Sequence, residues 1–143
     1  MEIGHGPSPL REFEHEDRVH SVNYQETVIV AEGVQCDVYS FATDPNKDLG
    51  VIRIDPGYHT PRQRVLRGDR TIEGYISGVG KLAITRSNGS KEVHEVGVTP
   101  DGQLTVDVAI GDVMQWQASE DSPLVVYEIC YPPYQNGRYK NIE

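Results

Sequence analysis

The sequence has few cysteines, few large apolar aromatic residues and little positive charge, and each shortage disfavours a class of protein. Its 143 residues include two cysteines, one tryptophan and two phenylalanines. A small secreted scaffold stapled by disulfides needs more cysteine than this. Basic residues number 13 against 22 acidic ones, and the formal net charge is −9. This balance argues against nucleic acid as a partner, because binding to it depends on basic contacts with phosphate.

Long apolar runs and several catalytic motifs are also missing. No apolar stretch approaches the roughly 20 residues that span a bilayer, and no secretory h-region opens the chain. There is no nucleophile elbow, no phosphate-cradling glycine loop and no Cys or His spacing of a metal site. Cys36 and Cys130 lie in apolar, strand-like runs, where a free cysteine behaves as a small buried hydrophobe. We therefore expect a cytoplasmic protein with no membrane partner.

Glycine and proline are frequent instead, with fourteen and nine residues, and they predict many short elements rather than long helices. Asn88-Gly89 between the apolar runs 81–86 and 91–98 predicts a hairpin. The cluster at 43–48 predicts a turn. About ten short strands at close spacing predict one all-β domain, a sandwich or a barrel.

The chain divides into three segments by composition. Residues 1–24 form a polar N-terminal arm without a sustained period, residues 25–133 form the β body, and residues 134–143 form a C-terminal strap. The arm holds His5, His15 and His20 at irregular spacing, which predicts a solvated arm rather than a metal site.

Three short segments together resemble the two half-motifs of the cupin superfamily. They are PG at 56–57, EGYISGVGKL at 73–82 and IGDV at 110–113, and the similarity covers roughly residues 51–133. The resemblance implies a cupin-like barrel, that is, a double-stranded β-helix or jelly roll. It also implies a homodimer formed through strands and the N-terminal arm.

Members of that family usually hold one divalent metal through two histidines and a glutamate of the first half-motif and a histidine of the second. In this sequence the two first-half histidine positions fall on Gln63 and Val65. The acid position falls on Glu73 when counted back from Gly80 and on Thr71 when counted back from Gly78. The segment after Gly111 contains no histidine. We therefore expect no metal and no other cofactor; the alternative is a rearranged metal set of His59, Glu73 and Gln63.

His59 and Glu73 are candidates for acid–base chemistry. The imidazole of His59 titrates near neutral pH, which suits a general acid or base. For Glu73 two interpretations stay open. Alternation with Ile72 and Ile76 would send its carboxyl to solvent, whereas the resemblance points it into the barrel, where desolvation would raise its pKa.

The resemblance extends to a metal-free branch of the superfamily, the nucleotide-sugar epimerases, in which a histidine takes a proton beside a carbonyl and a tyrosine returns one. Those roles would fall on His59 and on Tyr75 or Tyr127. The opposite wall of the barrel would then include Gln117 and Glu128. Arginine forks near residues 62–70 suit an anionic group. The ligand-binding candidates are Arg62, Gln63, Arg64, Gln115, Trp116 and Tyr127.

These residues predict a barrel that binds a small polar ligand, anionic or sugar-like, as a metal-independent isomerase or epimerase. Two alternatives remain: a non-catalytic ligand-binding or sensing barrel, and a metal-dependent enzyme with a rearranged ligand set.

Overall fold

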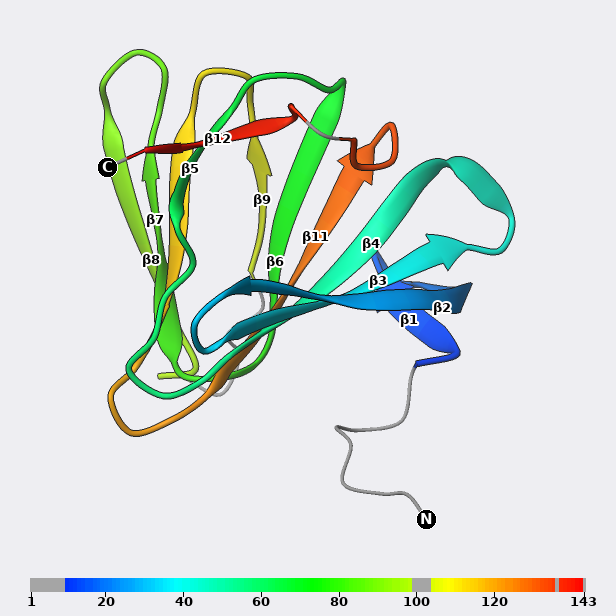
Figure 1. Ribbon diagram of the computed structural model, residues 1–143, viewed down its shortest axis with the longest axis horizontal. Helices are drawn as coiled ribbons and strands as arrows, with labels where there is room; N and C mark the ends of the chain where they lie inside the picture. The colour runs from blue at the N-terminus through cyan, green and yellow to red at the C-terminus, as the bar shows by residue number, and fades with distance from the viewer. Residues whose placement is uncertain (1–9, 99–103, 136, 143) are drawn as a thin grey trace.

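The computed structural model describes residues 10–98, 104–135 and 137–142, and within them the chain forms two facing β-sheets (Figure 1). The larger sheet has seven strands in the order β1-β2-β3-β4-β11-β6-β9. Their bounds are β1 Glu12–His15, β2 Arg18–Ala31, β3 Val34–Phe41, β4 Asp44–Ile54, β6 Arg70–Gly78, β9 Thr105–Val108 and β11 Leu124–Tyr131. The smaller sheet has the order β12-β5-β10-β7-β8. Its strands are β5 Arg62–Val65, β7 Gly80–Thr85, β8 Lys91–Val96, β10 Val113–Ala118 and β12 Tyr139–Ile142.

After β4 the chain passes repeatedly from one sheet to the other, so that both halves of the sequence contribute to both sheets. Figure 1 shows β5, β7 and β8 on the left, facing β6, β11 and β4. The last strand, β12, crosses the top of the molecule from the end of β11 towards β5. The described residues thus form a curled, half-closed all-β barrel. No helix in the described ranges is long and apolar enough to cross a membrane.

Two separate cores stabilise this arrangement. The inner core fills the space between the sheets and includes Trp116, Leu82 and Leu124. The outer core packs Phe13 of the N-terminal hairpin with residues such as Ile129 on the other face of the large sheet. Strands β6 and β11 are therefore covered on both faces, and this explains why residues 124–131 are nearly all apolar.

The Gly-x-Gly pair lies where the chain leaves β6 for β7. Gly78 has φ +92°, and a Cβ there would lie 2.0 Å from the carbonyl oxygen of Pro123. A Cβ on Gly80 would lie 2.2 Å from the carbonyl oxygen of Gln117. The backbone can change sheets at this point only because neither residue carries a side chain.

Two turns agree with the sequence. Asn88-Gly89 joins β7 to β8, and Gly89 has φ +92°, so the predicted hairpin is confirmed. The Gly111-Asp112 turn precedes β10, and the buried Asp112 carboxylate accepts hydrogen bonds from the backbone N–H groups of Ser87 and Ala109 at 2.8 and 2.9 Å. The carboxylate of the IGDV segment thereby ties two loops together.

The N-terminal part of the barrel differs from expectation. The predicted turn at 43–48 lies mostly within β4, where it forms an irregularity in the pairing with β3, because Asp44 pairs with Phe41 while Asp48 pairs with Ser40. The segment considered an arm contributes β1 and part of β2 to the large sheet. His15 is 5% exposed rather than solvated, since its ring packs edge-on against Tyr127. His5 lies outside the described residues.

Candidate functional site in the barrel interior

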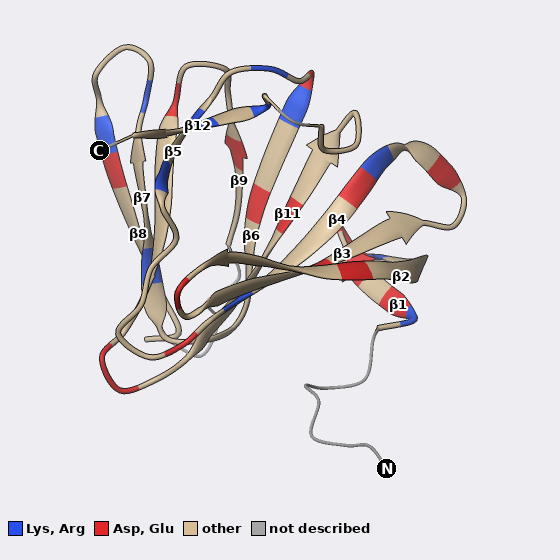
Figure 2. Ribbon diagram, viewed as in Figure 1, with Lys and Arg blue, Asp and Glu red and all other residues tan. Residues whose placement is uncertain are grey.

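Two carboxyl side chains face each other on neighbouring strands inside the barrel. Glu73 of β6 and Glu128 of β11 are direct partners in the antiparallel ladder, and Figure 2 shows them as adjacent red bands on the two strands. Side chains opposite each other in such a ladder have Cβ atoms about 5 Å apart, which brings the carboxyl groups into hydrogen-bonding contact. Glu73 is only 1% exposed, whereas Glu128 is half-buried.

Trp116 fixes the orientation of Glu73. Its indole Nε1–H donates a 2.7 Å hydrogen bond to Oε1 of Glu73, and both side chains are almost completely buried. The other oxygen, Oε2, is buried and receives no hydrogen bond from a protein donor. A proton on Glu73 resolves this deficit, because the resulting O–H can donate to the carboxylate of Glu128.

The electrostatics favour the same state. Burial raises the pKa of Glu73 well above its ordinary value of 4.5, and the charge and hydrogen bond of Glu128 raise it further. Two carboxylates in contact cannot both ionise readily in a desolvated site. A proton held by the pair would therefore reside on the more deeply buried Glu73.

A thiol and a phenol lie beside Glu128. The thiol of Cys130 donates to Oε1 of Glu128 over 3.5 Å, and the Cys130 sulfur lies 3.4 Å from the hydroxyl of Tyr139. Burial raises the pKa of both Cys130 and Tyr139, so both stay protonated. Burial also raises the pKa of Asp48, on the neighbouring strand β4. The half-buried carboxyl of Glu128 is thus the part of the pair that a ligand could reach.

Arg138 closes one side of this interior and is 3% exposed. Its guanidinium donates to Thr71 Oγ1 at 2.8 Å and to the carbonyl oxygens of Arg70 at 2.7 Å and Pro132 at 3.0 Å. These acceptors compensate for the buried charge. The contacts also tie the segment before β12 to the start of β6.

Known structures with this architecture identify the fold. CapF of Staphylococcus aureus, a capsular polysaccharide assembling protein, aligns with a TM-score of 0.61 and 16% identity over 85% of this chain. The Rru_A2000 protein of Rhodospirillum rubrum, described as a cupin-2 domain, aligns with a TM-score of 0.60 and 16% identity over 95% of this chain and 85% of its own. A mutant of Bacillus subtilis oxalate decarboxylase gives 0.65 and 17% identity over 82% of this chain and 30% of its own.

The chain has a cupin fold.

The fold class implied by the half-motifs is thereby confirmed. This chain spans 34% of the CapF chain, so the likeness covers one part of that larger protein. No family model matches the sequence, and no curated protein matches it.

Several of the predicted site residues lie on the outer face of the small sheet. His59 bridges to Gln117 beside β10, and its Nδ1 lies 3.0 Å from Nε2 of Gln115. Gln115 alternates with the interior Trp116, so Gln115 and the exposed His59 lie on the outer face. Arg62 and Arg64 are exposed on the same face of β5. Gln63 points the opposite way, and its Nε2 donates to Oδ1 of Asn141 at 3.2 Å.

The two tyrosines also occupy separate places. Tyr75 packs against the inner core, and its hydroxyl donates to the carbonyl oxygen of Gly78 at 2.8 Å. Tyr127 belongs to the outer core, where its hydroxyl lies 2.9 Å from Thr105 Oγ1 and 3.2 Å from His15 Nδ1. The barrel interior brings together Glu73, Trp116 and Glu128 from the sequence-based candidates, but not His59 or Tyr127. Glu128 lies beside Glu73 on the same sheet, not on the opposite wall.

The donor set does not fit the divalent metal that the cupin resemblance implies. No group of three His, Cys, Asp or Glu side chains within the described ranges is arranged to hold an ion. The alternative set of His59, Glu73 and Gln63 is not assembled, because His59 lies on the outer face while Glu73 lies inside. Oε1 of Glu73 already accepts the indole N–H of Trp116, and the carboxyl of Glu128 lies beside Glu73. We derive no chemical step through a metal.

Arg138, Cys130 and Tyr139 were missed as site residues. Nothing in the local sequence sets Arg138 apart from other arginines of the chain. The residues next to Cys130 and Tyr139 in the sequence are typical of any strand. The two side chains meet only because β12, after leaving β11, crosses the barrel to pair with β5. A usable signal existed for Glu128, the single acidic residue in the apolar run 124–131.

Proposed function

We propose that the protein binds a small polar organic ligand in the half-closed barrel and moves a proton on it without a metal. The observation that carries this proposal is the Glu73–Glu128 pair, in which a fully buried carboxyl with a raised pKa lies beside a half-buried one. Pairs of carboxyls whose environments separate their proton affinities are typical of acid–base sites. This supports the isomerase or epimerase class predicted from the sequence.

Glu128 is the proposed general base. Its carboxylate would accept the proton from a hydroxyl-bearing carbon beside a ligand carbonyl, forming an enediolate. Return of the proton to the same carbon gives exchange, and its return to the former carbonyl carbon, with the hydroxyl proton passing between the two oxygens, gives the isomer. Glu73 would act as a positioning residue, since its O–H hydrogen bond orients the Glu128 carboxylate. The reaction is balanced, because the carbon-bound proton and the hydroxyl proton each leave one atom and join another, and the product is an isomer of the substrate.

The proposal predicts enzyme-dependent hydrogen exchange. The purified protein in D₂O is expected to replace C–H by C–D beside the carbonyl in at least one member of a panel of aldoses, ketoses and 2-hydroxy carbonyl compounds. Proton NMR measures the loss of signal, and a thermal shift measures binding of the same compounds. A panel with neither binding nor exchange would contradict the proposal.

A non-catalytic ligand-binding barrel is the second candidate. The complete burial of Glu73 favours it, since a buried pair can also serve only to shape and orient the interior. A compound that shifts the melting temperature without any deuterium exchange would select this candidate.

We also propose that two copies associate through β2. Strand β2 pairs with β1 only up to Ser21, and no other described strand pairs with that edge of its remainder. That edge carries the exposed Val28, Ile29 and Val30, which are 41%, 66% and 37% exposed. Open apolar edges invite pairing with another chain. Light scattering is expected to give a dimer mass for the wild type and a monomer mass for Ile29→Lys; a wild-type monomer would contradict the proposal.

The proposed location is the cytoplasm. The two cysteines are free, and one of them is fully buried, which is compatible with a reducing compartment.

A further inference from the structure

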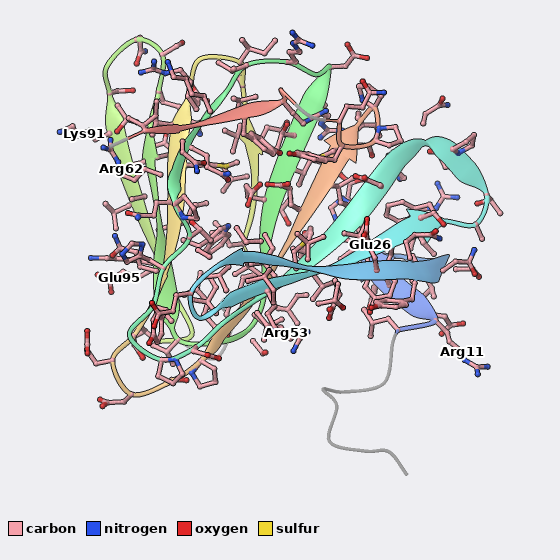
Figure 3. The ribbon with its side chains drawn as sticks, viewed as in Figure 1. Arg11, Glu26, Arg53, Arg62, Lys91 and Glu95 are labelled. Carbon is pink, nitrogen blue, oxygen red and sulfur yellow. The ribbon has the colours of Figure 1, made fainter. Side chains whose placement is uncertain are left out.

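The outer face of the small sheet carries an unusual concentration of positive charge for so acidic a chain. Five of the 13 basic residues point outward from it, and Glu95 is the acidic residue among the described side chains of that face; the five are Arg62, Arg64, Lys81, Lys91 and Lys140. Figure 3 shows Arg62, Lys91 and Glu95 projecting from the left of the molecule, away from the large sheet. We call this surface the cationic face.

Several cations of this face form no ion pair with another described residue. The ion pairs of the described residues engage other cations, such as Arg53 with Asp37 and Arg86 with Glu92. None of those ion pairs involves Lys81, Lys91 or Lys140. Lys81 lies opposite Glu95 in the ladder of β7 and β8, whereas Lys91 lies opposite Thr85 and Lys140 lies opposite Arg64. Lys91 and Lys140 are therefore available to a carboxylate on another molecule.

The charges lie at the margins of the cationic face and not at its centre. The ladder registers place Lys140, Arg64, Val113, Thr85 and Lys91 in one row across five strands. Cations occupy both ends of this row, while the middle is uncharged. A weakly polar centre with a charged rim is the usual anatomy of a protein–protein interface.

The side chains of the cationic face disfavour other polyanions. The ladder positions of the face carry no Phe, Tyr or Trp within the described residues, and single-stranded nucleic acids depend on such rings for base stacking. Independently of the proposed reaction, we propose that the cationic face docks an acidic, extended segment of a partner protein.

The strand spacing sets the charge pattern of that segment. Arg64 and Lys91 are three strand spacings apart in the row, which is about 14 Å. An extended peptide advances about 3.4 Å per residue, so acids four positions apart would match the two cations. The matching pattern is an acid, three uncharged residues and a second acid.

Fluorescence anisotropy with two labelled peptides of equal composition tests this. The peptide Glu-Val-Thr-Val-Glu, flanked by Gly-Ser, is expected to bind the full-length protein at low salt and more tightly than its isomer Glu-Glu-Val-Thr-Val. The double variant Arg64→Glu/Lys91→Glu is expected to bind the first peptide about tenfold more weakly. Both substituted residues are exposed, and a thermal melt checks that the variant folds.

The matched control reverses two exposed arginines away from this face. Arg11→Glu/Arg18→Glu changes the net charge equally, and Arg11 lies on the opposite side of the molecule (Figure 3). Wild-type-like binding by this control would support the cationic face as the site. Equal weakening in both double variants would show a net-charge effect and overturn the proposal. Binding of heparin or single-stranded DNA together with no binding of either peptide would also overturn it.

Discussion

Glu128→Gln is expected to slow the deuterium exchange of any ligand that the wild type turns over by about 100-fold or more, the usual contribution of a general base. Glutamine keeps the size of the side chain and can still contact Glu73 and Cys130, but it cannot accept a proton from carbon. Because Glu128 is only half-buried, the substitution should leave the fold intact. Single-turnover exchange in D₂O measures the rate, and a thermal melt measures the stability.

The comparison variant for this experiment is Glu73→Gln. Its amide can accept the indole hydrogen bond of Trp116 and donate to Glu128, so the orientation of the base survives. We expect Glu73→Gln to lose less than about tenfold in rate, since the base itself is retained. If both variants exchange as fast as the wild type, Glu128 is not the base. If only Glu73→Gln is inactive, the roles of the two residues are reversed.

Glu73→Gln is also expected to remove a pH-dependent loss of stability that the wild type suffers above pH 4.5. The buried environment raises the pKa of Glu73 well above 4.5, so the folded protein holds a proton that the unfolded chain has released. Stability falls with pH wherever the folded state binds more protons than the unfolded state. The stabilising effect of the proton is therefore complete below pH 4.5 and is lost as the pH rises through the elevated folded-state pKa.

The difference in unfolding free energy between Glu73→Gln and the wild type should grow with pH. Its slope is expected to approach about 1.4 kcal/mol per pH unit within that window, the value for one proton. Urea denaturation at half-unit steps from pH 4 to pH 8 measures it. The control Glu26→Gln replaces an exposed glutamate of β2 and should show almost no slope (Figure 3). Parallel curves for Glu73→Gln and the wild type would mean that Glu73 is ionised in the folded protein.

The strand pattern could be predicted because local chemistry determines it. Asn88-Gly89 adopts the predicted hairpin because glycine tolerates the positive φ that the turn requires. Turn-forming residues did not produce a turn where pairing with a neighbouring strand was possible. The cluster at 43–48 was absorbed into β4, since pairing with β3 on both sides of the irregularity holds it there.

The site was predicted only in part, because the sequence does not show which alternate residues of a strand point into the barrel. Alternation cannot distinguish inside from outside on β6, because both Ile72 and Glu73 are buried, one in the outer core and one against Trp116. The N-terminal hairpin that covers Ile72 comes from a segment with no clear period. His59 was predicted to lie at the site because it is close in sequence to the cupin-like segments. A single bridge to Gln117 places it on the outer face instead.

By itself the sequence determined the all-β class, the Asn88-Gly89 hairpin and the absence of a standard cupin metal set, because each depends on residue type and spacing. Only the tertiary structure decided that Glu73 and Glu128 lie side by side, that Arg138 closes the interior and that five cations gather on one face. Those features depend on which strands become neighbours, and neighbours far apart in the chain are selected by the packing of two cores rather than by any local pattern.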